Sequence, residues 1–198
     1  MKEPWRAPLL SDFEHDTRVV ALDQTLSNCG LVVIRIMPDE DYRAAVYGCQ
    51  VQVGLHQTIR PGTDLLSFPG TYEKGRQLDH ELEPWLSRSM YPAATPLHVA
   101  YEMPSVAGRR AESSLLAGFV IARRCPGAVM VSPMHVHAVL AGKPRRAETA
   151  KQEIAEAVAR YVPGSASREW NEHERDALAI GLTHLYDLKK AADDISGQ

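Results

Sequence analysis

The chain has 198 residues, a mass of 21.9 kDa and a formal net charge of −3, with 44% hydrophobic and 24% charged residues. These values are typical of a soluble globular protein of one domain and exclude wholesale disorder. No apolar run reaches the roughly 18 residues of a transmembrane helix, and the N-terminal residues lack the apolar centre of a signal peptide. With three scattered cysteines, we expect reduced thiols in a cytoplasmic protein rather than a disulfide framework or a zinc site.

Basic residues are concentrated in one part of this acidic chain. Residues 104–151 contain eight lysines and arginines against two acidic residues, a net charge of +6, so the remainder must sum to −9. A basic segment of this kind is typical of a surface that binds a polyanion beside a carboxylate-rich site. A solvated basic surface without a ligand is the alternative that charge alone leaves open.

Residue patterns in chain order predict strands first and helices later. β-Branched runs predict strands over 18–23 and 31–36, and alternation of apolar and polar residues predicts a third over 47–55. Apolar residues at helical spacing predict a helix over 71–90. The remaining predicted strands are 97–102 and 128–131, and the remaining helices are 111–124, 133–141, 147–161 and, with Asn171 as its N-cap, about 171–190.

This order of elements predicts an α/β domain over residues 18–190, with an extension over 1–17 and a polar tail over 191–198. We expect a mixed sheet of five strands in the order 3-2-1-4-5, numbered along the chain, with helices on both faces. The first three strands form an antiparallel meander, and the fourth enters by a right-handed crossover and lies parallel to the first. The first and fourth strands therefore end at the same edge of the sheet.

Two carboxylates end these two neighbouring strands, Asp23 after the first and Glu102 after the fourth. Ligand sites in open α/β sheets usually form at this carboxyl edge. Two acids held close together repel each other unless a proton or a cation lies between them, and Mg²⁺ prefers such oxygen ligands. Each acid taken alone is also consistent with an ordinary strand-end residue.

The start of the last predicted helix adds His173 and Asp176, which are three positions apart and so lie on one side of the helix. Apolar residues continue this side, so we expect it to face the sheet. Capping is the alternative for Asp176, but other residues of the first turn can satisfy the helix dipole. We therefore interpret Asp23, Glu102, His173 and Asp176 as ligands of two divalent cations, an arrangement used for displacement at phosphorus.

Four segments of the chain resemble those of the RuvC-type Holliday junction resolvases, in the same order. The first hairpin of that family is similar to VVALDQTLSNCGLVVI, and its central strand with a catalytic Glu is similar to HVAYEMP. Its basic loop and Lys-bearing helix resemble VSPMHVHAVLAGKPRRAETAKQEI, and its closing helix resembles EHERDALAIGLTHLY. The similarity covers about residues 18–188.

This resemblance implies an RNase H-like fold, a homodimer and Mg²⁺-dependent paired nicking of four-way DNA junctions in recombination and repair. Whether Mn²⁺ substitutes for Mg²⁺ is left open. The resemblance implies metal ligands at Asp23, Glu102, His173 and Asp176, and it places Lys151 as a catalytic residue near the scissile phosphate. The DNA-contacting candidates are the basic loop and a basic pair after the central strand: Lys143, Arg145, Arg146, Arg109 and Arg110.

The chain also departs from the family pattern. An aromatic residue often follows the central Glu to wedge open the junction, whereas here Met103, Pro104, Ser105 and Val106 follow. The N-terminal extension and the span 56–70 are further differences, which suggest a divergent, phage-borne member in the cytoplasm of a bacterium or infected host. The alternatives are a catalytically silent DNA-binding or scaffold protein of the same fold and an actin- or sugar-kinase-like phosphotransferase. Clustered unpaired acids argue against the first, and the short chain with its glycine-poor first loop fits the second badly.

Other histidines are interpreted as structural. His135 and His137 are two positions apart on a predicted helix and so point away from each other, and we therefore do not expect them to share a metal ion. We expect His184, on the inward stripe of the last helix, to be a packed, hydrogen-bonded core residue.

Overall fold

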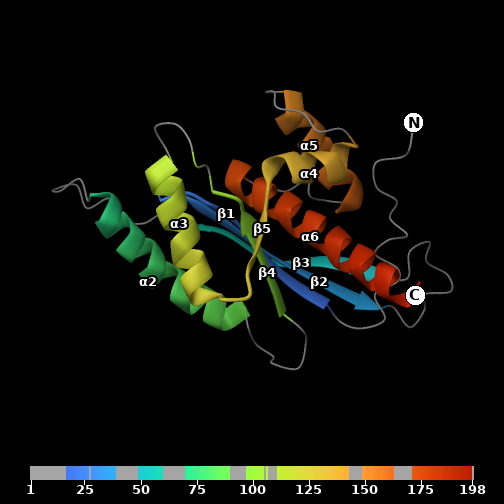
Figure 1. The fold of residues 1–198 in the computed structure, drawn as a ribbon, viewed down its shortest axis with the longest axis horizontal. Helices are drawn as coiled ribbons and strands as arrows, with labels where there is room; N and C mark the ends of the chain where they lie inside the picture. The colour runs from blue at the N-terminus through green and yellow to red at the C-terminus, as the bar shows by residue number, and fades with distance from the viewer. Residues whose placement is uncertain are drawn as a thin grey trace.

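A mixed β-sheet with helices on both faces forms the structure, a computed structural model that describes residues 17–26, 28–38, 49–59, 70–89, 97–104, 106, 111–142, 149–162 and 171–197 (Figure 1). The strands are β1 (Thr17–Gln24), β2 (Cys29–Pro38), β3 (Cys49–Ile59), β4 (Leu97–Glu102) and β5 (Val129–Val131). The helices are α2 (Thr71–Ser89), α3 (Ala111–Arg124), α4 (Pro133–Ala141), α5 (Thr149–Tyr161) and α6 (Glu172–Ser196). The α/β class and the mixed sheet expected from the sequence are confirmed.

The described strands are hydrogen-bonded in the order β3-β2-β1-β4-β5. β1 pairs antiparallel with β2, which pairs antiparallel with β3, whereas β1 with β4 and β4 with β5 are parallel. The register pairs Leu22 with Tyr101. The next residues on these two strands are Asp23 and Glu102, so both acids follow the last paired position at one edge of the sheet.

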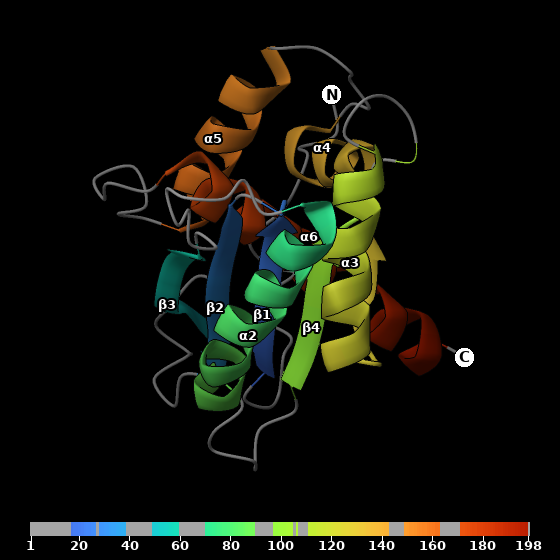
Figure 2. The same cartoon turned by 90° about the vertical axis from the view of Figure 1, so that its left-hand side faces the viewer.

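Alternate residues of β1 face two different layers of helices. Val19 and Ala21 belong to the buried cluster formed with α4, α5 and α6. Val20 and Leu22 belong to a second buried cluster with α2 and α3, which lie on the opposite face (Figure 2). Because strand side chains alternate in direction, Asp23 continues the row of Val19 and Ala21 and faces α6. The strand is buried on both faces, which explains its continuous apolar run.

A close approach between α6 and the sheet depends on Gly181. A Cβ atom there would lie 2.5 Å from Cδ1 of Ile34 and 3.0 Å from Cβ of Ala21. Glycine therefore lets the helix backbone rest on β1 and β2. This contact lets the middle of α6 pack closely on β1 and β2, farther along the helix than its first turn.

The last helix is longer than the sequence pattern predicted. It continues to Ser196 rather than ending near Lys190, so most of the expected polar tail is exposed helix. Nothing in this segment breaks a helix before Gly197, and Lys189 forms an i, i+4 ion pair with Asp193 that supports the extra turns. In the described part of the chain, no helix is long and apolar enough to cross a membrane.

Candidate active site

Asp23 and Glu102 occupy the ends of neighbouring parallel strands. Asp23 is buried, with 5% of its surface exposed, and Glu102 is partly buried. Gln24, one residue after Asp23, donates a hydrogen bond from Nε2 to the backbone carbonyl of Glu102 at 2.6 Å. This bond ties the two strand ends together just beyond their regular ladder, so the two acids are held side by side.

The first turn of α6 is held in place by a capping box. The side-chain Oδ1 of Asn171 accepts a hydrogen bond from the backbone N–H of Glu174 at 3.0 Å, and the backbone N–H of Asn171 donates to Oε2 of Glu174 at 3.4 Å. These bonds satisfy N–H groups that a helix start would otherwise leave without partners. Asn171 thus starts the helix as the sequence predicted, two residues before His173.

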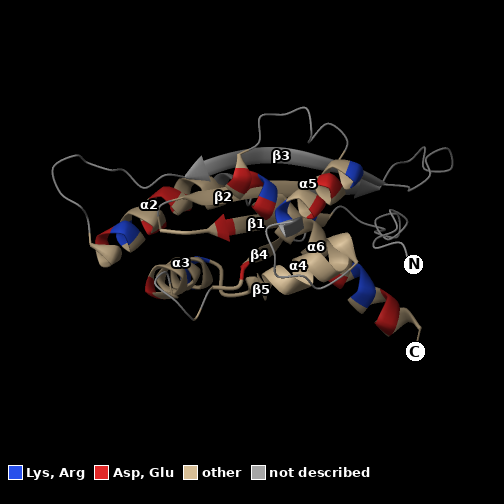
Figure 3. Ribbon diagram, turned by 90° about the horizontal axis from the view of Figure 1, so that it is seen from above, with Lys and Arg blue, Asp and Glu red and all other residues tan. Residues whose placement is uncertain are grey.

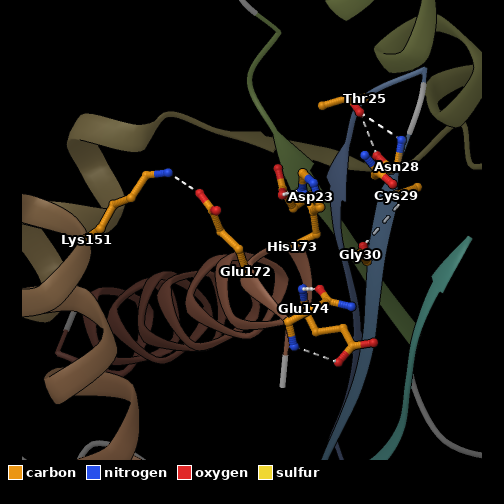
Figure 4. Close-up of polar contacts among 10 residues, drawn as sticks. Asp23, Thr25, Asn28, Cys29, Gly30, Lys151, Glu172, His173 and Glu174 are labelled. Atoms are coloured by element: carbon orange, nitrogen blue, oxygen red, sulfur yellow. Dashed lines mark hydrogen bonds and ion pairs between the residues drawn. The ribbon is translucent and has the colours of Figure 1, made fainter. Parts of the chain in front are cut away.

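Gly30 is the residue that lets this first turn reach Asp23 (Figure 4). In the β1–β2 ladder Gly30 pairs with Asp23. A Cβ atom at Gly30 would lie 2.1 Å from the backbone oxygen of His173 and 2.8 Å from the backbone nitrogen of Glu174. In the sequence, Gly30 is recognisable only as a glycine that follows a short loop. Its packing role was not predicted, because it depends on a contact between β2 and the distant helix α6.

His173 contacts Asp23 directly. Its Nδ1 lies 2.7 Å from Oδ2 of Asp23, and the two side chains come from α6 and β1 (Figure 4). The hydrogen bond with Asp23 raises the pKa of His173 above its ordinary value, although burial opposes this rise. The neighbouring negative charges of Asp176 and Glu172 act in the same direction as Asp23.

The pKa values of two carboxyl groups in the site are raised above their ordinary values. Burial raises the pKa of Glu102 to about 8, with further contributions from a hydrogen bond and the charge of Asp23 and from the charge of Asp176. Burial also raises the pKa of Asp176 to about 6, assisted by the charges of Asp23 and Glu172. Both carboxyl groups therefore keep their protons to a higher pH than exposed ones do, chiefly because burial disfavours their charged forms and the neighbouring acids add to this.

Lys151 approaches this cluster from α5. Its Nζ forms an ion pair with Oε1 of Glu172, the first residue of α6, and both side chains are exposed (Figure 4). The positive charge of Lys151 partly opposes the rise in the pKa of Glu102 and of Asp176. Glu172 had no role in the sequence-based hypothesis.

The four predicted metal ligands are brought together but are not arranged as a closed cage. No three His, Cys, Asp or Glu side chains within the described segments are grouped so that they hold one metal ion as they stand. An oxygen of Asp23 is engaged by His173 instead. The donor set nevertheless fits a hard divalent cation, because carboxylate oxygens and an imidazole with excess negative charge are its usual ligands.

Part of the predicted basic surface has a structural role. Arg124 makes two bonds to Asp79 on α2, from Nε to Oδ1 at 2.6 Å and from Nη2 to Oδ2 at 2.9 Å. Arg124 also lies 3.2 Å from Glu83, and Arg123 forms a further ion pair with Asp79. Figure 3 shows basic and acidic residues intermixed along α2, α5 and the C-terminal end of α6. Arg123 and Arg124 therefore join α3 to α2, and Asp79 and Glu83 balance their charges.

The five predicted DNA-contacting residues lie outside the described residues: Lys143, Arg145, Arg146, Arg109 and Arg110. Their assignment stays a prediction.

The remaining histidines contact separate partners. Nε2 of His135 lies 2.9 Å from Asp187 on α6, whereas Nε2 of His137 lies 3.3 Å from Glu153 on α5. The two imidazoles thus point to different helices, as their spacing predicted. His184 is buried as expected, but the expected hydrogen bond is wrong: neither of its ring nitrogens has a partner among the described residues. Its ring instead packs edge-on against His98 at 5.8 Å between centroids, and burial lowers its pKa to about 4.

Comparison with known proteins identifies the fold. No protein-family model and no curated protein matches the chain. Among solved structures, its neighbours include Holliday junction resolvases. RuvC from Thermus thermophilus is similar with a TM-score of 0.64 and 20% identity over 88% of this chain and 97% of RuvC.

Two further solved structures extend this comparison. The same RuvC bound to a Holliday junction substrate is similar with a TM-score of 0.63 and 20% identity, over 88% of this chain and 96% of that one. The yeast mitochondrial Holliday junction resolvase matches with a TM-score of 0.52 and 11% identity, over 96% of this chain and 90% of that one. At these identities the likeness defines the fold.

Proposed function

We propose that this protein is a divalent-metal-dependent, structure-selective DNA endonuclease that resolves four-way junctions by paired nicks. The observation that supports it most is the meeting of Asp23, Glu102, His173 and Asp176 at one sheet edge, in a fold similar to RuvC. The finer assignments of an RNase H-like architecture, Mg²⁺ as the ion and a cytoplasmic location belong to the same proposal.

The acid cluster itself argues for a bound cation rather than a structural role. The raised pKa values of Glu102 and Asp176 mean that holding these groups together costs folding free energy when they ionise. A protein that needed only the fold would be more stable with uncharged residues at these positions. The cluster is therefore better explained by a ligand that supplies positive charge, which disfavours a catalytically silent scaffold.

Each group then has a defined task. Asp23, Glu102, His173 and Asp176 would hold a pair of divalent cations, which would supply an activated water and charge stabilisation for the leaving 3′ oxygen. His173 orients the carboxylate of Asp23 through its Nδ1 contact. Lys151, extended from α5 towards the acids, would neutralise charge on the phosphate that is cut.

Paired nicking also requires two active sites on one junction. A four-way junction presents equivalent strands related by a two-fold axis, and a symmetric dimer presents two copies of one site in the same relationship. We therefore propose a homodimer with one acid cluster per protomer. This part of the proposal is tested by the oligomeric state of the protein on the junction, measured by light scattering.

Incubation with an end-labelled four-way junction tests the proposal. Mg²⁺ should produce paired nicks at symmetric positions, and a linear duplex of the same arms should stay intact. Chelation of the metal should abolish cleavage, and Mn²⁺ is tested as a substitute. Tight junction binding without cleavage in either metal would contradict the nuclease assignment and favour the silent DNA-binding alternative. Equal cleavage of duplex and junction would contradict structure selectivity.

A further inference from the structure

An ion pair joins the starts of α5 and α6 beside the acid cluster (Figure 4). Lys151 lies in the first turn of α5, and Glu172 is the first residue of α6. Their side chains are 68% and 55% exposed, and Nζ of Lys151 contacts Oε1 of Glu172 (Figure 4). Both groups are therefore accessible to an incoming DNA strand.

Glu172 is not needed to start α6. The capping box of Asn171 and Glu174 already satisfies the helix start. Glu172 instead places a further carboxylate next to His173 and beside Asp23, where like charges repel (Figure 4). The interaction that offsets this repulsion is the ion pair with Lys151.

An exposed ion pair of this kind is readily exchanged. Such pairs stabilise a protein only slightly because solvent screens them and both side chains lose rotamer freedom. A phosphodiester oxygen is an equivalent anion for an ammonium group. A strand that reaches the acid cluster can thus replace the carboxylate on Lys151 without a change of fold.

We propose that Glu172 is a counter-ion that occupies Lys151 in the free protein and is displaced by a DNA phosphate when a strand enters the site. This inference rests on the proposed function and deepens it, because it assigns Glu172 a role in DNA binding. Glu172 lowers the affinity for DNA in general. Only DNA that the protein also binds through other contacts displaces Glu172 and pairs with Lys151. Once Glu172 is displaced, Lys151 no longer neutralises its carboxylate. The acid cluster then has one more uncompensated negative charge beside it, which favours the binding of a cation.

The test compares DNA affinity among variants that keep the shape of the side chain. Dissociation constants for a four-way junction and for a linear duplex are measured by fluorescence anisotropy in chelator, so that no cleavage occurs, over a series of salt concentrations. Glu172→Gln should bind about two- to fivefold more tightly, the equivalent of releasing one exposed ion pair. The slope of log K against log salt should stay close to that of the parent, because Lys151 neutralises the same DNA phosphate in both proteins.

Two controls separate this effect from general repulsion. Glu156→Gln removes an exposed carboxylate of α5 whose partner in the structure is Gln152, and it should match the parent. In a Lys151→Gln background, Glu172→Gln should no longer improve binding. Equal affinity of Glu172→Gln and parent, or an equal gain with and without Lys151, overturns the inference.

The proposed function is judged separately in the same experiment. It depends on the preference of the parent protein for junction over duplex, whereas the inference depends on changes between variants on either DNA. A parent that binds both DNAs equally contradicts junction selectivity but leaves the counter-ion effect measurable. A parent that binds neither DNA overturns both.

Discussion

The imidazole of His173 lies 2.7 Å from the carboxylate of Asp23, from Nδ1 to Oδ2, although the two residues are 150 positions apart in the chain. One belongs to the first strand and the other to the last helix. The site therefore exists only after the sheet has formed and α6 has docked on it. Anything that moves the first turn of α6 should change the chemistry before it changes the fold.

Gly30→Ala tests this dependence. The new methyl group would overlap the backbone of His173, which cannot give way as a flexible side chain can. We expect single-turnover cleavage to fall about 10- to 100-fold, the usual effect of disturbing the support of a metal ligand. Unfolding free energy should fall by about 1–3 kcal/mol from overpacking.

Gly181→Ala is the matched control for this variant. It introduces a similar overlap farther along α6, against the side chains of Ile34 and Ala21. It should lose comparable stability while keeping most of its cleavage rate below its melting temperature. Equal cleavage by the two variants would contradict the positioning role of Gly30.

Thermal stability without metal should fall as pH rises. Glu102 and Asp176 have raised pKa values in the folded protein, about 8 and about 6, and His173 is shifted in the same direction. The folded state therefore binds more protons than the unfolded state between about pH 4 and pH 8, and it loses this advantage as they dissociate. Melting temperatures in chelator should drop by several degrees over this range, and Mg²⁺ should restore more of the loss at about pH 8 than at about pH 5.

Glu102→Gln is the control for this pH dependence. The variant keeps the shape of the side chain but has no proton to lose, so its melting temperature should depend less on pH. A profile identical to that of the parent would show that Glu102 does not titrate as described.

Cleavage should depend on pH in the opposite sense. A metal-binding imidazole must be neutral, and the contact with Asp23 raises the pKa of His173 above its ordinary 6.5. Activity should therefore decline as pH falls through a value above about 6.5. His173→Asp, which offers a carboxylate instead, should extend activity to lower pH. A flat parent profile down to about pH 5 would argue that His173 is not a neutral metal ligand.

Lys151→Ala should slow cleavage on the order of 10²-fold, because a positive charge beside the reacting phosphate is lost. Lys190→Ala removes an exposed charge near the other end of α6 and should leave the rate unchanged. Single-turnover rates on a pre-bound junction separate this effect from weaker binding. An unchanged rate for Lys151→Ala would remove Lys151 from the mechanism.

The sequence predicted the part of the site that depends on strand order. The parallel placement of β4 beside β1 is enough to bring Asp23 and Glu102 to one edge of the sheet. That Asp23 faces α6 was not predicted and follows from the burial of alternate residues of β1. Contacts between distant elements could not be predicted from the sequence. The fit of Gly30 under His173 and the pairing of Arg124 with Asp79 depend on distances that no local pattern encodes. Glu172 was missed because nothing in its neighbourhood distinguishes it from an ordinary first-turn acid.

The most direct test of the acid cluster is the single-turnover cleavage of a four-way junction by the parent and by Asp23→Asn in Mg²⁺. The variant removes a metal-binding charge but little surface, so junction affinity should stay close to that of the parent. Its cleavage rate should fall by roughly 10³-fold or more, since the lost charge is worth several kcal/mol in the transition state. Nicking by Asp23→Asn at the parent rate would contradict the assignment of this site.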